Sequence, residues 1–415
     1  MEKRAIPVST RLGSVRYDIR GPLSRRARAL EAEGREIVRL NIGNPGLFGF
    51  SVPAHLRAAI ADALPASEAY CHQQGLPEAR DAIAAYQRKN GSSAAHRDRI
   101  FIGNGVSELI DISLRALLNA GDEVLIPAPD YPLWTAATRL NSGEPVYYSC
   151  PPERDHLPDA DQIEALVTPR TRALVIINPN NPTGAVYPRA VLEALVDIAS
   201  RHGLMLLCDE IYDSVLYDGA RFEALASIAG DVPCVSYGGL SKVHLACGYR
   251  VGWLSLTGDE KRIRELAHAL DLLAAMRLCS NVPAQWAIKP ALEGPSAIAA
   301  LTEPGGRLHT ARAAVCAAIA RSEFLDVATP QGALYAFPGV DSERFPGFDD
   351  EAFALDLLER QSVLLVPGSS FNIPLRNRFR VTLLPEPALL TEVFARIEQE
   401  LARSAEAAAA QRRVA

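Results

Sequence analysis

Short, wholly apolar runs alternate with amphipathic stretches through the middle of the chain. Residues 173–177 and 204–208 carry no charged position, which is typical of strands buried on both faces of a parallel sheet. The stretches between such runs repeat apolar residues at helical spacing, as in 189–202. The alternation predicts an α/β fold with a mostly parallel, doubly wound sheet between helices. Strands are expected at 99–103, 123–127, 145–148, 172–178, 204–208 and 234–237, with helices at 107–119, 133–140, 159–167 and 189–202.

The flanking regions predict a smaller α+β unit. Residues 1–21 are polar and turn-rich, so they are expected to form an extended arm, and the tail 405–415 is expected to fray. The predicted domains are 1–55 (arm and first part of the small domain), 56–300 (large cofactor-binding domain) and 301–415 (C-terminal small domain). Further helices are expected at 23–33, 53–64, 76–89, 260–277, 311–320 and 351–359, and strands at 38–41, 363–366 and 378–383.

Composition narrows the class of protein. With 48% hydrophobic and 22% charged residues, the 415-residue chain is typical of a globular protein, and its net charge of −6 argues against a nucleic-acid partner. Seven cysteines occur without a CxxC pair, which indicates reduced thiols. Because there is no secretory signal and no apolar run long enough to span a bilayer, we expect a cytoplasmic protein without a membrane partner.

Residues able to do chemistry follow four of the predicted strands. Ligands of open parallel sheets bind beyond the carboxyl ends of the strands. The segments 103–107, 178–184, 209–212 and 241–242 all fall at such ends. We therefore expect these four segments to meet in one crevice. None of them forms a metal-ligating set, and no metal is expected.

Lys242 is unusual among the five lysines of the chain. It alone is surrounded by small and apolar residues, where desolvation favours a neutral amine that can attack a carbonyl. The preceding Ser241 and the later Arg250 are suited to holding a phosphate. Together they favour a Schiff-base lysine that binds pyridoxal 5′-phosphate. The alternative is a lysine whose apolar stem is buried and whose ammonium reaches water.

Two other candidates also have a structural alternative. Gly105, Val106 and Ser107 begin a predicted helix, where they could bind a phosphate or simply cap the helix. Asp209 follows an apolar strand, where its carboxylate could keep a pyridine nitrogen protonated or cap the next segment.

Three further residues are ambiguous when taken alone. Asn181 lies in the run Asn-Pro-Asn-Asn-Pro-Thr-Gly, which is a turn by composition but could present an amide to a cofactor oxygen. Tyr131 could stack on a flat ring or pack as a turn aromatic. Arg380 interrupts an apolar strand, where it could form a salt bridge or bind a carboxylate with both nitrogens of its fork.

Taken together, these motifs resemble the class I/II aminotransferases, the fold-type-I pyridoxal-phosphate enzymes. The combination of Asn-Pro-Asn-Asn-Pro-Thr-Gly, Asp-Glu-Ile-Tyr and Ser-Lys with a later Gly-Tyr-Arg is specific, and the resemblance extends from Tyr17 to Arg380. Within the family, the chain is most similar to bacterial glutamate–pyruvate (alanine) aminotransferases, on stretches such as 17–22, 40–45, 102–110, 127–134 and 276–279. The resemblance implies a seven-stranded large domain, a homodimer with shared active sites, and transamination between an L-amino acid and a 2-oxo acid.

The resemblance also implies a role for each site residue. Lys242 would form the Schiff base, Asp209 would pair with the pyridine nitrogen, and Tyr131 would stack on the ring. Asn181 and Tyr212 would bind the ring's 3-oxygen. Phosphate ligands would be Gly105, Val106, Ser107, Ser241 and Arg250, with Tyr70 reaching the phosphate of the partner subunit. Substrate contacts would come from Arg380, Asn181, the backbone of Gly43, and Tyr17.

One segment departs from the family pattern. After Lys242 the chain reads Val-His-Leu-Ala-Cys (243–247), where similar proteins more often carry a threonine, an aromatic residue and an arginine. Two alternatives therefore stay open beside alanine and glutamate: an aminotransferase of a specialised biosynthetic pathway, and a lyase or decarboxylase on the same fold. A regulator of gene expression is disfavoured, because the N-terminal arm is too short for a DNA-binding module.

Overall fold

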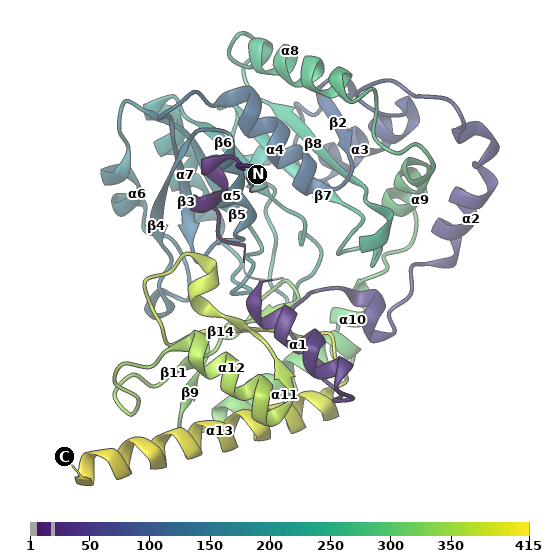
Figure 1. Cartoon of the computed structure of the whole chain (residues 1–415). Coiled ribbons are helices and arrows are strands. Elements are labelled where there is room, and N and C mark those ends of the chain that lie inside the picture. The colour runs from purple at the N-terminus through teal and green to yellow at the C-terminus, as the bar shows by residue number, and fades with distance from the viewer. Residues whose placement is uncertain (1–5, 18–20, 415) are drawn as a thin grey trace, which may run out of the picture.

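A seven-stranded sheet forms the centre of the larger part of the molecule in the computed structural model, which describes residues 6–17 and 21–414 (Figure 1). Among these residues the strand order is β2-β8-β7-β6-β5-β3-β4, and β8 alone runs antiparallel to its neighbours. The predicted mostly parallel α/β sheet is confirmed. The strands are β2 (Ile100–Gly103), β3 (Glu123–Ala128), β4 (Glu144–Ser149), β5 (Thr171–Ile177), β6 (Met205–Asp209), β7 (Cys234–Gly239) and β8 (Gly252–Thr257).

Helices cover both faces of this sheet, which explains the apolar strands. In β5, Ala173 and Val175 pack on one face, while Leu174 and Ile176 pack on the other, because successive side chains point in opposite directions. Side chains of α4 (Val106–Leu117), α5 (Leu133–Leu140) and α8 (Glu260–Met276) complete the first cluster. The opposite clusters include α6 (Ala160–Leu166), α7 (Arg189–His202), α2 (Ala54–Asp62), α3 (Pro77–Lys89) and α9 (Ile288–Glu293).

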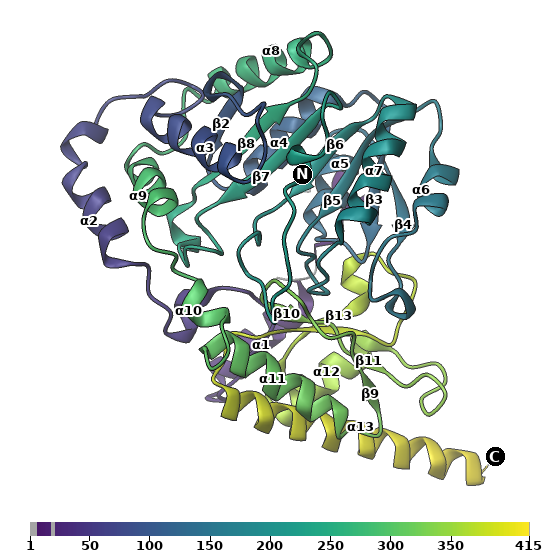
Figure 2. The same ribbon diagram turned by 180° about the vertical axis from the view of Figure 1, so that it is seen from behind.

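A second group of elements lies below the large sheet and joins the two ends of the chain (Figure 2). Strand β1 (Val38–Arg39) pairs in parallel with β12 (Val363–Leu364), so the N-terminal region packs with the C-terminal one. The domain bounds 1–55, 56–300 and 301–415 stay a prediction. The remaining elements are β9 (Leu325–Asp326), β10 (Tyr335–Ala336), β11 (Gly339–Val340), β13 (Val366–Pro367), β14 (Phe379–Thr382), α1 (Pro22–Ala32), α10 (Ala299–Thr302), α11 (Arg307–Ala320), α12 (Asp350–Gln361) and α13 (Pro387–Val414).

Several elements differ from the sequence expectation, because no strand was expected at β8 to β11 and no helix at α9, α10 or α13. Strand β8 was not expected, because its glycine and hydroxyl residues dilute the apolar pattern, yet all six of its residues are buried. The tail expected to fray continues α13 to Val414, and the apolar residues of this helix up to Leu401 pack into the lower core. The arm expected to be extended contains a 3₁₀ turn, Thr10–Ser14; its residues 1–5 and 18–20 lie outside the described part.

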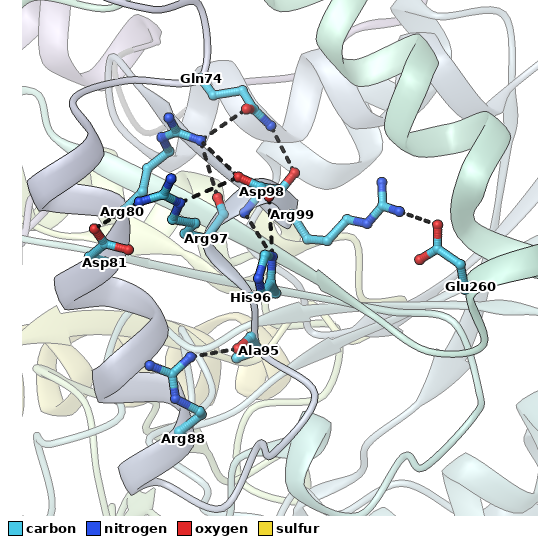
Figure 3. Close-up of polar contacts among 10 residues, drawn as sticks. All are labelled: Gln74, Arg80, Asp81, Arg88, Ala95, His96, Arg97, Asp98, Arg99 and Glu260. Carbon is cyan, nitrogen blue, oxygen red and sulfur yellow. Dashed lines mark hydrogen bonds and ion pairs between the residues drawn. The ribbon is translucent and has the colours of Figure 1, made fainter.

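Hydrogen bonds fix the segment that precedes β2 (Figure 3). The Gln74 side chain donates to the Asp98 carbonyl (3.0 Å) and accepts from Arg80 (3.0 Å), while its backbone carbonyl accepts from Ile102 in β2 (2.9 Å). These contacts join the start of α3 to the sheet and hold the chain just after Tyr70. Within the described residues, no helix has the length and apolar character needed to cross a bilayer.

Candidate active site

A cavity of about 600 Å³ lies at the carboxyl ends of β2, β5, β6 and β7. All four strands run in the same direction, since β8 is antiparallel to both β2 and β7, and the four segments singled out in the sequence do meet there. Of the predicted site residues, Gly105 and Tyr70 do not line the cavity. The others do: Tyr17, Gly43, Val106, Ser107, Tyr131, Asn181, Asp209, Tyr212, Ser241, Lys242, Arg250 and Arg380.

The N-terminus of α4 opens onto one end of this cavity. Gly105 precedes the helix with a φ of +88° and supplies no side-chain cap, so the first N–H groups of the helix stay available. The positive φ favours glycine at position 105, and a methyl group there would lie 2.2 Å from a guanidinium nitrogen of Arg250, which would have to move. Free N–H groups, the helix dipole and a nearby guanidinium make this end suited to a phosphate.

Lys242 is one of the residues that line the cavity, and it is half-buried. Its Nζ donates to the carbonyl of Gly43 (2.7 Å) and lies 3.9 Å from the sulfur of Cys247. The Cys247 thiol donates in turn to the Ser241 carbonyl (2.9 Å). The amine therefore reaches the cavity from the loop after β7 and contacts the segment after β1.

Asp209 is the buried carboxylate of the site, with 4% of its surface exposed. Burial raises its pKa from 3.8 to about 6, although the backbone N–H of Ile211 (3.3 Å) and the charge of Lys242 act in the opposite direction. A cation placed next to this carboxylate would relieve the cost of burying its charge. A protonated pyridine nitrogen is such a cation.

Arg380 is a buried cation with no carboxylate partner in the part of the chain that the structure describes. It is 1% exposed, and its fork donates to Asn181 Oδ1 (2.9 Å) and to the Asn41 carbonyl (2.6 Å), while its Nε has no hydrogen-bond partner. Among the described residues no acidic side chain forms an ion pair with it, so the salt-bridge alternative is wrong for this part of the chain. An unpaired buried guanidinium at a cavity wall is suited to an incoming carboxylate.

Sequence reasoning did not single out every lining residue. Tyr335 is 3% exposed and faces the cavity from β10, and Cys247 was noted only as part of the atypical segment 243–247. Tyr335 follows an apolar residue and precedes Ala336 and Phe337, so its pattern is that of a core aromatic. The one feature of the sequence that could have indicated its role is the polar hydroxyl that Tyr335 carries within a short apolar strand. The other residues not singled out are Ile42, Asn44, Ile110, Ile211 and Gly248.

Tyr70 lies apart from the cavity of its own chain. Its side chain is 78% exposed, although the segment that follows is firmly held by Gln74. Its reach toward a partner subunit stays a prediction. Tyr17, on the arm, does lie at the cavity: its hydroxyl is 2.8 Å from that of Tyr131, and the two rings meet edge to face.

Comparison with known proteins decides the family. The model of aminotransferase class I and II matches residues 35–397. The chain belongs to the class I and II aminotransferases. It is 46% identical to the glutamate-pyruvate aminotransferase AlaA of Escherichia coli K12 over 92% of this chain and 94% of that one. It is 47% identical to an alanine aminotransferase of Mycobacterium tuberculosis H37Rv (92% and 90%). A crystal structure of an Escherichia coli aminotransferase superposes with a TM-score of 0.93 at 44% identity, covering 97% and 99%.

Aminotransferases of this family use pyridoxal phosphate, and the cavity of this member fits that group in three independent places. The uncapped N-terminus of α4 beside Arg250 suits the phosphate. The buried Asp209 suits a protonated ring nitrogen. The Lys242 amine lies in the same cavity and suits the aldehyde.

Asp209→Asn should stabilise the cofactor-free aminotransferase at pH 8. Because the folded-state pKa of Asp209 (about 6) exceeds 3.8, the folded protein binds more protons than the unfolded chain between these values. The stability that this group contributes is therefore lost as the pH rises through about 4 to 6. Asparagine avoids that loss, so we expect a gain of about 2–3 kcal/mol at pH 8 and little change at pH 4. Denaturant unfolding at both pH values measures it.

Pyridoxal phosphate should remove this advantage at pH 8, because a protonated ring nitrogen pairs with a carboxylate and not with an amide. The control is Asp213→Asn, which changes a carboxylate that accepts from Tyr86 and does not line the cavity. The cofactor should stabilise that control as much as the wild type. If it stabilised Asp209→Asn equally well, the assignment of Asp209 to the ring nitrogen would be wrong.

Proposed function

We propose that this aminotransferase exchanges amino groups between alanine and glutamate, with pyruvate and 2-oxoglutarate as the 2-oxo acids. The observation that carries the proposal is a single cavity holding the Lys242 amine, the buried Asp209 carboxylate and the unpaired Arg380 guanidinium. The names of the two similar enzymes, a glutamate-pyruvate and an alanine aminotransferase, support the choice of substrates.

Lys242 is the proposed acid and base of the reaction. In one half-reaction its Nζ would take the proton from the α-carbon of the amino acid. In the other half-reaction it would return a proton to the α-carbon of the 2-oxo acid. Bound pyridoxal phosphate supplies the electron sink for that carbon and carries the amino group between half-reactions. Asp209 would hold a proton on the ring nitrogen, and Tyr131 would pack against the ring face.

The remaining cofactor contacts are assigned by their place along the cavity. Val106, Ser107 and the backbone at Gly105 would bind the phosphate through the α4 N-terminus. Ser241 and Arg250 would add a hydroxyl and a positive charge. Asn181 and Tyr212, which follow β5 and β6, would bind the 3-oxygen attached to the cofactor's pyridine ring.

The substrate would lie between Arg380 and the arm. The Arg380 fork would hold the α-carboxylate, with Asn181 and the backbone of Gly43 beside it. Tyr17 and Tyr131 would form the opposite wall through their paired hydroxyls. That wall consists of two uncharged phenol side chains, so it can accept the methyl group of alanine or hydrogen-bond the side-chain carboxylate of glutamate.

A panel of amino donors against pyruvate and 2-oxoglutarate tests the substrates. We expect the pairs alanine with 2-oxoglutarate and glutamate with pyruvate to give the highest kcat/KM. Much faster exchange with an aromatic or branched donor would favour the specialised-pathway alternative. Decarboxylated or deaminated products without conversion of the cofactor to its amino form would favour a lyase.

A homodimer is part of the proposal, with each Tyr70 reaching the phosphate of the partner subunit. Its supports are the 78% exposure of this tyrosine and further exposed apolar residues such as Leu272 and Met276. We expect light scattering to give twice the mass of one chain. Tyr70→Phe should weaken pyridoxal-phosphate binding about tenfold or more, as expected for one lost hydrogen bond to a charged group, without dissociating the dimer.

Two outcomes would contradict this arrangement: a monomeric holoenzyme with full activity, or a Tyr70→Phe variant that binds the cofactor like the wild type. Tyr249→Phe is the matched control, since Tyr249 is a partly buried tyrosine that does not line the cavity. As a further proposal, the enzyme acts in the cytoplasm, because all seven cysteines are free thiols, which suits a reducing compartment.

A further inference from the structure

Tyr335 joins three parts of the active site that come from distant segments of the chain. It lies in β10, which pairs with β14 so that Tyr335 is opposite Thr382 and its neighbour Ala336 is opposite Val381. The side chain is 3% exposed and lines the cavity. Its place on the short strand next to β14 brings it alongside Arg380.

The ring of Tyr335 packs on the guanidinium of Arg380. The central carbon of that group lies 4.2 Å from the ring centroid, and the ring of Phe371 is also near, at 4.9 Å. Since no described carboxylate pairs with Arg380, these aromatic rings and two carbonyl-type oxygens are what stabilise its buried charge. The ring faces also restrict the plane in which the fork can lie.

The hydroxyl of Tyr335 contacts two further site residues. It accepts a hydrogen bond from the hydroxyl of Tyr212 (3.2 Å), and the two rings meet edge to face. It also lies against Gly43: a methyl group there would be 2.2 Å from the Tyr335 oxygen. Gly43 is the residue whose carbonyl accepts from Lys242.

We propose that Tyr335 is a positioning residue for the substrate carboxylate: its ring sets the orientation of the Arg380 fork, while its hydroxyl contacts Tyr212 and lies against Gly43. The inference rests on the proposed role of Arg380. The electrostatics agree with it. Burial alone would raise the pKa of Tyr335, but the positive charges of Lys242 and Arg380 outweigh burial and lower it, so the phenol lies in a strongly positive part of the site.

Two substitutions separate the ring from the hydroxyl. Tyr335→Leu removes the aromatic face, and we expect the KM of both the amino acid and the 2-oxo acid to rise about tenfold while kcat changes less than threefold. Tyr335→Phe keeps the face, and its KM values should stay within about twofold of the wild type. If the leucine variant does not fold, Tyr335→Met takes its place, because the flexible methionine side chain can fill an irregular space without an aromatic face.

The matched control is Tyr217→Leu. Tyr217 is also a buried tyrosine of the same core cluster and packs on a buried arginine, Arg312, at 5.1 Å, but it does not line the cavity. Its loss should lower thermal stability without changing the KM of either substrate. An equal rise in KM for this control would show that Tyr335→Leu acts through general loosening, and would overturn the proposal.

Calorimetric binding of propanoate, a carboxylate that cannot react, supplies a readout independent of turnover. We expect its Kd to rise about tenfold in Tyr335→Leu and to stay within about twofold in Tyr335→Phe and Tyr217→Leu. Unchanged binding in Tyr335→Leu would overturn the proposal. A wild type that binds propanoate in this Tyr335-dependent way but transfers no amino group would instead refute the proposed function and leave the positioning role standing.

Discussion

Lys242→Ala should abolish steady-state amino-group exchange, lowering kcat by on the order of 10⁴-fold or more. The amine is both the proposed attachment point of the cofactor and the proposed acid and base at the substrate's α-carbon, so one substitution removes two functions. Its Nζ is held by the Gly43 carbonyl at 2.7 Å, and no other lysine in the described part of the chain lines the cavity. A coupled assay of pyruvate formation from alanine measures the effect.

The control for this variant is Lys261→Ala. Lys261 is exposed at the start of α8 and lies outside the cavity, so its activity should match that of the wild type. Near-normal turnover in Lys242→Ala would refute the proposed chemistry. Partial recovery by added methylamine, which restores a free amine, would support it.

Arg380→Ala should raise the KM of both substrates roughly 100-fold, corresponding to about 3 kcal/mol for a lost charge-assisted contact. The effect is expected for amino acid and 2-oxo acid alike, because both present the same carboxylate. Within residues 6–17 and 21–414, the hydrogen-bond partners of Arg380 are neutral, Asn181 and the Asn41 carbonyl, so its charge is available to the substrate. Initial rates over a substrate range give the two constants.

Arg312→Ala is the matched control for this second prediction. Arg312 is also buried and packs on a tyrosine, but it forms an ion pair with Asp218 (2.7 Å) away from the cavity. Its loss should reduce stability and leave KM unchanged. Unchanged KM values in Arg380→Ala would rule out its role as the carboxylate anchor.

The sequence predicted the location of the site because each buried strand, and the polar segment that follows it, can be recognised from the local residue pattern. Apolar strands of a parallel sheet carry their carboxyl ends to the same edge, so the residues after β5, β6 and β7 had to meet once the sheet was recognised. Asn181, Asp209 and Lys242 were found in this way. Arg380 was found because a charge is conspicuous within an apolar strand.

The residues that the sequence did not indicate depend on contacts between distant segments. Tyr335 reaches the site because β10 pairs with β14. The residues next to it in the sequence do not indicate that it lies beside Arg380 and Gly43. The final helix, which begins at Pro387, likewise packs Leu390, Phe394 and Leu401 into the lower core far from their neighbours in sequence. Tertiary packing of this kind overrides local composition.

The most direct test of the account is borohydride reduction of the purified protein after incubation with pyridoxal phosphate, followed by mass spectrometry of its peptides. The account predicts a single reduced phosphopyridoxyl group attached to Lys242, and none on the peptide that contains Lys261. A protein that stays colourless with the cofactor and carries no such group on Lys242 would contradict it.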